Sequence, residues 1–585
     1  KQMTGNIISA TKVEPAGNNE VSAASGVWNL DDVYDYKRGA NWPEAGVANP
    51  DTLIENNFAT TLYTGNNSTD VQTFESGIDF ANKGGMIWFK SRSSAQAARI
   101  LDTERGTQSS LIPSGTNGSN NLGADGLSYL NNGFSIGWEG GDIAAAQNYV
   151  AWQFKQASRF FGIVTYEGNG TAGRTVAHNL GAVPGMIILK NLSSGSEGWR
   201  VYHRGANGGT NPEQYYAMLQ ATNAFASAST PWNNTAPTST EFTLGTDTGS
   251  NGNGNSFVAY LFAHETGSDS MIQCGSYTGN GNTTGPVINL GWEPQFIITK
   301  PSSSTGNWYM YDTMRGLTGS GANDAELYPS SSGAEYAGRE SIDLTSTGFK
   351  LATTNTENNA SGVTYIYMAI RRPNMATITD ATEVFAIDGE NTAAPYHTSG
   401  FPVDFAIKKR LTSATWLVAS RLLQAKKSAT DATTVEADET DAMFDFNNGY
   451  FKAAAYGEDA AYAYMWKRAK GYFDVVTYTG TESARTVAHS LGVAPEMMWI
   501  KCRDAVHSWA AYHVALGNTG IIYLNSNEAA FSISGSTVLN NTTPTSSVFT
   551  VGANHVLNQS AKKYIAYLFA TLAGISKLGS VAHSG

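Results

Sequence analysis

Charge, cysteine and long apolar runs are all scarce in this sequence. Charged residues make up 15% of the 585 residues, against about 25% in an average chain. No stretch approaches the ~18 consecutive apolar residues of a membrane-spanning helix, so we expect no membrane insertion. Two cysteines, Cys274 and Cys502, cannot build a disulfide framework or a four-ligand zinc site. We therefore expect two buried free thiols and neither a metal nor a cofactor.

Basic residues are outnumbered by acidic ones. The 37 Lys and Arg against 49 Asp and Glu give a formal net charge of −12. A nucleic-acid partner requires a basic surface that displaces counterions from phosphates, so this balance excludes that class of function. Residues 1–5 lack the basic and apolar segments of a signal peptide, and position 1 is Lys1 rather than methionine. The sequence leaves open whether the native chain extends before Lys1.

Glycine, in contrast, is abundant, with 61 residues, and it accompanies 41% hydrophobic and 11% aromatic residues. That much apolar material builds sizeable cores, which excludes global disorder. Tight hairpins need backbone conformations with positive φ, which glycine adopts freely. The glycine content therefore indicates many tight turns between short strands.

Sequence landmarks recur in the same order about every 100 residues. The clearest pair is RTVAHNLG at 174–181 and RTVAHSLG at 485–492. Each copy continues into an apolar strand that ends in lysine, then a tryptophan in four copies, then a strand with an aromatic start and a closing strand of alternating aromatic residues. The lysines are Lys90, Lys190, Lys300, Lys408 and Lys501. A 100-residue period is too long for a solenoid unit and predicts five tandem domains, each with its own core.

Short runs rich in Val, Ile, Phe, Tyr and Trp alternate with turn clusters inside each copy, which is typical of antiparallel β structure. Helical spacing is found only at residues 30–39 and 416–425. The sequence thus predicts an all-β fold of tandem sandwiches after a leader. The predicted segments are a leader with a short helix at 1–50 and repeats at 51–157, 158–266, 267–375, 376–468 (the divergent fourth) and 469–574.

Residues 574–580 parallel residues 270–276, where the third copy begins. The pattern predicts that 575–585 is the start of a further repeat. Either this segment is a vestigial strand or the native chain extends beyond Gly585, and we favour the second interpretation.

Recurring histidines and carboxylates are candidate catalytic residues. His178 and His489 occupy the same motif, and His203 and His513 follow a tyrosine in two copies. No Ser or Cys nucleophile recurs with them, so we interpret them as structural. The cluster from Asp102 to Arg105 and its echo from Asp312 to Arg315 could suggest a glycosidase carboxylate pair. Because the second copy has His203 in place of the aspartate, we interpret the arginine as a brace for a loop and assign no catalytic residue.

Two further patterns allow a binding role. The tryptophans at a fixed place in four copies could stack on sugars, although core anchors are more common at such positions. They are retained as candidate glycan or partner contacts: Trp199, Trp308, Trp416 and Trp509. The glycine-rich segment 168–173 superficially suggests a phosphate loop, but no helix is predicted after it, so we interpret it as a hairpin turn.

Two sets of motifs resemble those of bacteriophage tail and tail-fibre proteins, many from marine phages. One is ASGVWNLDDVY at 24–34 with RGANWP at 38–43. The other is the repeat itself, with a Tyr-Thr-Gly start, a Leu-Gly turn before proline, a strand ending in lysine, an Arg-Gly pair, a Gly-Phe strand and a closing aromatic strand. The likeness covers roughly residues 24–574 and implies jelly-roll sandwiches of the concanavalin A-like lectin type, without implying catalytic residues.

The resemblance implies a non-enzymatic virion structural protein, a tail or tail-fibre component that acts in assembly and host-surface attachment. Its expected partners are other virion proteins, copies of itself and a host cell-surface glycan. Alternatives that stay open are a glycan-binding lectin array, a polysaccharide depolymerase and a capsid decoration protein. The divergence of candidate polar residues between copies favours the structural role, because catalysis requires one complete set.

Overall fold

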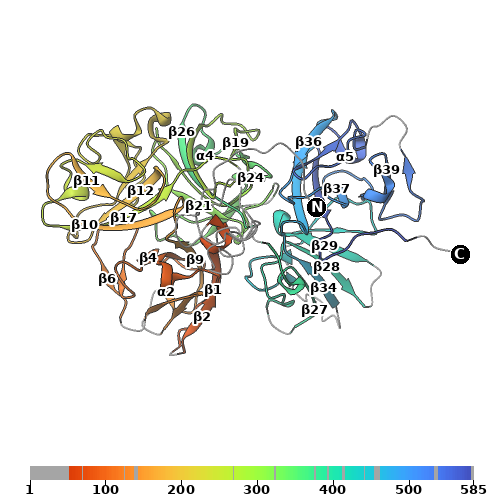
Figure 1. The fold of residues 1–585 in the computed structure, drawn as a ribbon, viewed down its shortest axis with the longest axis horizontal. Coiled ribbons are helices and arrows are strands. Elements are labelled where there is room, and N and C mark those ends of the chain that lie inside the picture. Colours follow the sequence, from red (N-terminus) through yellow and green to blue (C-terminus); the bar gives the residue numbers. More distant parts are fainter. Residues whose placement is uncertain are drawn as a thin grey trace, which may run out of the picture. The chain divides into compact units, whose positions relative to one another are not determined.

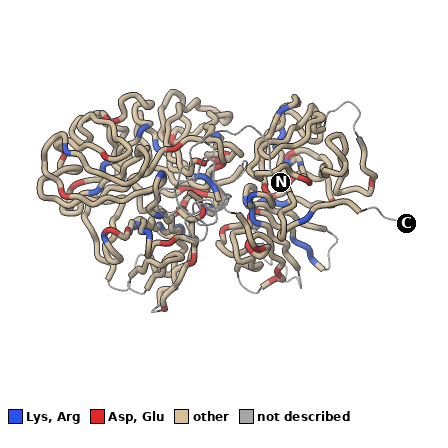
Figure 2. Tube along the Cα trace, in the orientation of Figure 1, with Lys and Arg blue, Asp and Glu red and all other residues tan. Residues whose placement is uncertain are grey.

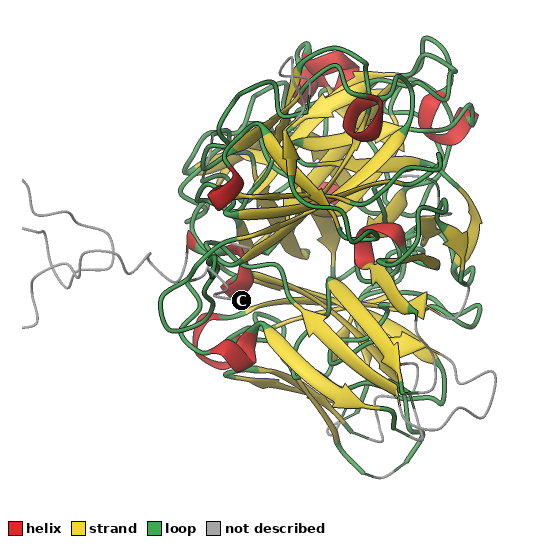
Figure 3. Cartoon of the chain, turned by 90° about the vertical axis from the view of Figure 1, so that its right-hand side faces the viewer, coloured by secondary structure: helices red, strands yellow, loops and turns green. Residues whose placement is uncertain are grey.

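The computed structural model describes residues 52–581, except 69, 124–125, 138–142, 268, 320, 322–323, 374–376, 392–393, 412–414, 440–441, 453–460 and 533–537. The predicted all-β class is confirmed, with 41% strand, 8% helix and many antiparallel sheets (Figures 1 and 3). The segment from Ile54 onward forms one compact unit, so the predicted domain boundaries stay predictions. The leader and its helix at 30–39 lie outside the described residues.

One sheet order recurs in the five predicted repeats: the first strand, the closing strand, the strand that ends in lysine and the strand that follows it (Figure 1). Repeat 1 has β1 (Phe58–Thr64), β9 (Asn148–Lys155), β3 (Gly85–Ser91) and β4 (Arg99–Asp102). Repeat 2 has β10 (Phe161–Glu167), β17 (Ser256–Ala263), β12 (Pro184–Asn191) and β13 (Arg200–His203). Repeat 3 has β18 (Ile272–Thr278), β26 (Thr364–Arg371), β20 (Pro294–Pro301) and β21 (Tyr309–Asp312).

Repeats 4 and 5 add two short strands to the same order, which makes each large sheet six-stranded. In repeat 4 the strands are β27 (Phe385–Gly389), β34 (Ala461–Trp466), β28 (Phe405–Arg410), β29 (Trp416–Ser420), β30 (Lys426–Ala429) and β31 (Ala437–Asp438). In repeat 5 they are β35 (Phe473–Thr479), β42 (Lys563–Phe569), β37 (Met497–Cys502), β38 (Ala510–His513), β39 (Gly520–Tyr523) and β40 (Phe531–Ser532).

In repeats 1–3, Leu111, Ala217 and Leu327 form single bridges to the fourth strand, so short strands continue the edge of the large sheet there. Smaller sheets accompany each large sheet. They are formed by β2 (Gln72–Glu75), β8 (Gly133–Ile136) and β7 (Leu127–Leu130); β5 (Ser109–Ser110) and β6 (Asn120–Asn121); β11 (Arg174–Ala177) and β16 (Glu241–Leu244); β14 (Tyr215–Tyr216) and β15 (Ala226–Ser227); β19 (Val287–Asn289), β25 (Gly348–Leu351) and β24 (Ile342–Thr345); β22 (Asp324–Glu326) and β23 (Tyr336–Arg339); β32 (Ala442–Met443) and β33 (Phe451–Lys452); β36 (Arg485–Ala488) and β41 (Val548–Val551).

The described helices are all short. The α-helices are α2 (Phe80–Lys83), α3 (Thr248–Asn251), α4 (Thr356–Asn359) and α5 (His555–Asn558), and the 3-10 helices are η2 (Ile54–Asn56), η4 (Ala206–Gly209), η5 (Pro212–Gln214), η6 (Ala381–Glu383), η7 (Arg421–Leu423) and η8 (Val514–Leu516). The helix predicted at 416–425 is wrong, because β29 occupies 416–420 and only η7 follows. Its apolar spacing reflects alternation along a strand that pairs with β28.

The central strands of the large sheets in repeats 1–3 are buried on both faces, which explains their unbroken apolar runs. All eight residues of β12 are buried. In repeat 1, Ile87 and Phe89 face the repeat's own cluster with the small sheet. The alternate residues Met86 and Trp88 belong to a cluster that also contains residues of repeats 2 and 3. The second face of each large sheet is therefore the face through which repeats meet.

Alternation also corrects the predicted register of repeat 4. β28 places Lys409 opposite Trp416, and the Lys409 ammonium lies 5.3 Å from that ring centroid. Lys300 lies over Trp308 in the same way, at 5.7 Å. Lys409, not Lys408, is therefore the counterpart of the other lysines. Lys408 points to the opposite face, 3.5 Å from Glu390, because a shift of one residue exchanges the two faces of a strand.

The segment 168–173 is a turn, but it is not a hairpin. It connects β10 to β11, which belong to different sheets. Gly170 and Gly173 have φ of 66° and 83°, and the amide of Asn169 donates to Oδ1 of Asn251 at 3.0 Å. The glycines are therefore used to cross between layers.

A buried asparagine at the end of a short helix fixes this crossing in three repeats. Asn251, Asn359 and Asn558 are each fully buried. Each side-chain Oδ1 accepts from the backbone of the crossing turn, at 2.8–3.0 Å. Each Nδ2 donates to a carbonyl six residues earlier, at 2.7–2.8 Å. One side chain thus holds the turn, the helix and the loop before it.

The glycine that precedes the aromatic strand is required by close backbone contact. A Cβ added at Gly348 would lie 1.9 Å from the carbonyl oxygen of Ile288, and one at Gly133 would lie 2.0 Å from that of Phe74. Gly133 also has φ of 128°. The Gly-Phe pattern is thus a steric requirement in repeats 1 and 3, whereas repeats 2 and 5 have Glu241 and Val548 at this position.

We expect Gly348→Ala to lower the free energy of unfolding by about 2–4 kcal/mol, because β19 and β25 must move apart. Urea denaturation followed by circular dichroism measures the change. Gly195→Ala is the matched control, since a Cβ there meets no atom within 4 Å. Equal stability of the two variants would contradict this account.

Candidate functional site

The recurring lysines lie at junctions between repeats. The ammonium of Lys190 donates to the carbonyl of Thr116 in repeat 1 at 2.8 Å. Lys300 reaches Thr222 in repeat 2 at 3.2 Å. In the same way Lys90 reaches Ser332 of repeat 3 at 2.8 Å, and Lys501 reaches Thr433 of repeat 4 at 3.2 Å. Each of these four lysines is buried, so a cation of one repeat is solvated by the backbone of another.

Burial weakens the hold of these lysines on their protons. It lowers the pKa of Lys90 and of Lys190 to about 8 and that of Lys300 to about 7. The pKa of Lys501 is lowered for the same reason. Removal from water disfavours the charged form, and the backbone carbonyls replace only part of the lost hydration.

The tryptophans predicted as candidate glycan contacts serve the same junctions. The indole Nε1 of Trp199 donates to the carbonyl of Ile112 at 3.2 Å, that of Trp308 to Met218 at 3.1 Å, and that of Trp509 to Ala429 at 2.7 Å. In each case the acceptor belongs to the preceding repeat. These three indoles are fully buried, whereas Trp416 is 38% exposed.

Arginine and glutamate add an ion pair at two junctions. Arg92 of repeat 1 bonds Glu335 of repeat 3 at 2.9 Å, and Arg503 of repeat 5 bonds Glu436 of repeat 4 at 2.7 Å. In both pairs the glutamate amide also donates to the arginine carbonyl, at 2.9 and 2.8 Å. The two arginines neighbouring Glu335, Arg315 and Arg92, hold its pKa below the ordinary value despite its burial.

A second set of contacts runs through the ends of the fourth strands of repeats 1–3. The Tyr260 hydroxyl of repeat 2 donates to Oδ2 of Asp102 in repeat 1 at 2.7 Å. Nε1 of Trp152 in repeat 1 donates to Oδ2 of Asp312 in repeat 3 at 2.9 Å. Between repeats 2 and 3, Nε2 of His203 lies 3.0 Å from the carbonyl oxygen of Tyr367.

Repeats 1, 2 and 3 therefore form what we term the closed triple: repeat 1 bonds repeat 2, repeat 2 bonds repeat 3, and repeat 3 bonds repeat 1. Their inner faces share one apolar cluster. Phe58 lies 5.6 Å from Phe296, and Phe154 lies 5.5 Å from Phe262, measured between ring centroids. The junction polar groups surround a common core.

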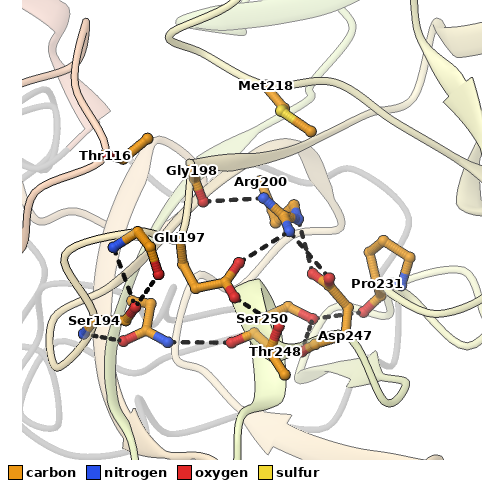
Figure 4. A network of polar contacts seen from close by, with 12 residues as sticks. Thr116, Ser194, Glu197, Gly198, Arg200, Met218, Pro231, Asp247, Thr248 and Ser250 are labelled. Carbon is orange, nitrogen blue, oxygen red and sulfur yellow. Dashed lines mark hydrogen bonds and ion pairs between the residues drawn. The ribbon is translucent and has the colours of Figure 1, made fainter.

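A network of charged residues in repeat 2 supports the junction between repeats 1 and 2 (Figure 4). Arg200 bonds Asp247 through Nε at 2.8 Å and Glu197 through Nη2 at 3.3 Å. Glu197 also offers its backbone carbonyl to Lys190 at 2.6 Å, while its carboxylate accepts from Thr248 at 2.7 Å. The loop that solvates the lysine is thus fixed by an ion pair.

The structural interpretation of the histidines agrees with their surroundings. Nδ1 of His178 and of His489 accepts from a backbone amide two residues ahead, at 3.3 and 3.2 Å, and each ring stacks on a phenylalanine. His203 accepts from the Gly205 amide at 3.0 Å, and burial lowers its pKa to about 3. His513 accepts from the amide of Ala515 at 3.1 Å.

The arginines braced by aspartate also hold loops, as the sequence suggested. Arg105 bonds Asp102 and Arg315 bonds Asp312, each at 2.6 Å. Arg315 also donates to the carbonyl of Met310 at 3.0 Å and lies 5.2 Å from the ring centroid of Trp152. The aspartates, which could have suggested acid–base chemistry, therefore join an arginine to an aromatic residue of a neighbouring repeat.

A buried ion cluster joins repeats 3, 4 and 5. Arg468 bonds Glu293 and Asp474, at 2.8 and 2.9 Å, and Arg372 bonds Asp474 at 2.8 Å. The two arginines hold the pKa of Asp474 far below its ordinary value. A cavity of about 300 Å³ beside the cluster is lined by Glu293, Arg372 and Arg468, whose charges are already paired.

Figure 2 shows basic and acidic residues scattered over the described trace rather than gathered in one basic stretch. Among the described residues, no three His, Cys, Asp or Glu side chains are grouped to hold a metal ion. No helix of the described part is long and apolar enough to cross a bilayer. Cys274 and Cys502 are buried free thiols, as predicted.

The chain belongs to the family described as a domain of unknown function, DUF7483, whose match covers residues 55–372 and 381–585. The break between the two matched segments falls between repeats 3 and 4. No curated protein and no solved structure matches the chain.

Sequence reasoning assigned the tryptophans mainly to the core, but it overlooked the lysines as junction groups. Their recurrence at the end of an apolar strand was the available signal, since a lysine that completes such a strand needs acceptors. The Arg92–Glu335 pair could not be found this way, because its partners are 243 residues apart.

We expect Trp308→Phe to lower the local stability of the junction between repeats 2 and 3 by about 2–4 kcal/mol, because it leaves a cavity and an unpaired carbonyl. Hydrogen exchange of the β21 amides measures the change. Trp416→Phe is the matched control, and it should change stability by no more than about 0.5 kcal/mol. Equal effects would contradict the assigned role of the buried indole.

The stability of the chain should rise with pH between 7 and 8.5. Lys300 has a folded pKa of about 7, whereas an unfolded lysine titrates near 10.4. The unfolded state therefore binds more protons in this window, and the free energy of unfolding increases with pH. In Lys300→Met the rise should be smaller by about 1–2 kcal/mol. Urea unfolding at several pH values tests this, and an unchanged slope would contradict it.

Proposed function

We propose that this chain is a non-enzymatic structural protein of a bacteriophage virion, a tail or tail-fibre component that acts in assembly and host-surface attachment. Each repeat is proposed to be a jelly-roll sandwich of the concanavalin A-like lectin type. The proposed partners are other virion proteins, copies of the chain and a host-surface glycan.

The observation that carries the proposal is the repeated junction. Lysine and tryptophan are common ligand-binding residues, yet in this molecule three of each bond the carbonyls of a preceding repeat. The recurring aspartates bond aromatic residues of adjacent repeats. Reactive side chains are thus used to fix one repeat against another, which favours a rigid scaffold over a catalyst.

The phage assignment rests on the motifs at 24–34 and 38–43 and on the repeat pattern. Free sheet edges invite pairing with other chains, and fibre proteins commonly form symmetric oligomers. A rigid scaffold with variable loops suits a particle that must assemble and contact a cell surface.

Immuno-electron microscopy of purified virions from the strain that encodes this chain tests the location. We expect antibodies against the 585-residue chain to label the tail or its fibres. Labelling of the head would favour capsid decoration instead, and absence from washed particles would overturn the proposal.

Binding to a glycan array and release of reducing sugar from host polysaccharide test the alternatives. We expect no sugar release. Binding that is lost in Trp416→Ser, but kept in Trp416→Phe, would assign glycan recognition to the exposed indole. Sugar release by the purified chain would contradict the non-enzymatic role.

A further inference from the structure

Repeat 4 exposes the face through which other repeats meet. Three apolar residues of its large sheet lie on this face: Ile387 of β27, Tyr462 of β34 and Trp416 of β29. They are 53%, 46% and 38% exposed. Leu411, two residues after Lys409, is 66% exposed. The strands that carry or precede the exposed groups are adjacent in the order β27-β34-β28-β29, so the groups form one patch.

The matching positions of the other repeats are buried. Strand pairing makes Tyr462 the counterpart of Val150, Val258, Ile366 and Ile565, which are at most 2% exposed. Trp416 corresponds to Trp199, Trp308 and Trp509, each fully buried. Ile387 corresponds to Ile163, Cys274 and Val475, which are at most 8% exposed. At these positions the face is therefore covered in the other repeats and exposed in repeat 4, whose Phe405 and Ile407 on the same face are buried.

Repeat 5 presents the complementary surface. In repeats 1–4 the loop after the short strand that follows the fourth strand offers carbonyls to a lysine of another repeat, at Thr116, Thr222, Ser332 and Thr433. Pairing of Ala511 with Ile522 makes Tyr523 and Asn527 the equivalent positions in repeat 5. Within the described part of the chain, no lysine or tryptophan of another repeat donates to them. Repeats 4 and 5 together thus have one exposed sheet face, on repeat 4, and one loop, on repeat 5, whose carbonyls accept from no lysine or tryptophan of another described repeat.

Two further observations are consistent with a missing third repeat beside repeats 4 and 5. Ile575 and Leu578 pack against the apolar cluster shared by repeats 3, 4 and 5, and they lie in the segment 574–580 that parallels the beginning of repeat 3. The family match also breaks between repeats 3 and 4. Within the compact unit that begins at Ile54, repeats 4 and 5 thus share one lysine contact of the kind that closes repeats 1–3, and the third position of such a ring is vacant.

We propose that the vacant position is an interaction surface for a sixth repeat of the same type, which closes repeats 4 and 5 into a second triple. The occupant carries an apolar sheet face that covers Ile387 and Tyr462. It offers a loop carbonyl to the indole of Trp416. Its own tryptophan and lysine bond the carbonyls of Tyr523 and Asn527, respectively.

The closed triple explains why one repeat fits and a second copy of the chain does not. Each repeat of the closed triple has one face that is covered by another repeat and one loop whose carbonyl accepts from the lysine of another repeat. Three repeats therefore provide an acceptor for each of the three lysines. Two copies of the pair would place four repeats in the ring, one more than the lysine contacts close in repeats 1–3. A heterologous contact that does not close gives open association instead.

The test compares the 585-residue chain with an extended chain in which residues 277–372 are appended after Ser580. Gly579 and Ser580 match Gly275 and Ser276, so the junction sequence is retained. Hydroxyl-radical footprinting then reports the oxidation rates of Trp416 and Tyr462. We expect Trp416 to react readily in the 585-residue chain and as slowly as Trp308 in the extended chain. Trp199 serves as an internal control whose rate stays low in both.

The matched control is the extended chain with Trp308→Ser in the appended copy only, which should regain part of the Trp416 reactivity. If the appended strands gain hydrogen-exchange protection while Trp416 stays reactive, the proposal is wrong. Appended strands that gain no protection also count against it, because the vacant face should template them. Dimerisation of the 585-residue chain that protects Trp416 and is abolished by Trp416→Glu would assign the surface to a second copy and overturn the proposal.

Discussion

The structure depends on a lysine ammonium buried in one repeat and solvated by a carbonyl of another. A buried ammonium is costly unless several acceptors surround it. Lys190 has one acceptor from its own repeat and one from repeat 1, so neither repeat alone satisfies it. The lysine therefore penalises separation of the repeats, while the tryptophan beside it adds apolar contact and a second bond to the preceding loop.

The other polar residues support the contacts between repeats. Arg200 and Asp247 hold the loop whose Glu197 carbonyl faces Lys190. Asp102 and Asp312 each balance an arginine and accept from an aromatic residue of a neighbour. Asp102 and Asp312, which could suggest catalysis from the sequence, are thus engaged in contacts between repeats.

Much of the fold could be predicted because its signals are local. Alternating apolar residues, turn clusters and a period of about 100 residues predicted all-β repeats, and the burial of Trp199 followed from its fixed place after a strand. The false helix at 416–425 and the register of repeat 4 had a common cause. The sequence there diverges, and a shift of one residue exchanges the faces of β28, which only strand pairing resolves.

The sequence by itself determined the strands, the repeat and the set of recurring lysines, tryptophans and aspartates, because these are properties of neighbouring residues. Tertiary structure decided what those residues contact. Lys90 bonds Ser332, 242 residues away, and that contact turns three consecutive repeats into a closed triple. The same lysine and tryptophan pattern leaves Trp416 exposed in repeat 4, since burial depends on which repeat lies against a face, and no local pattern encodes a distant neighbour.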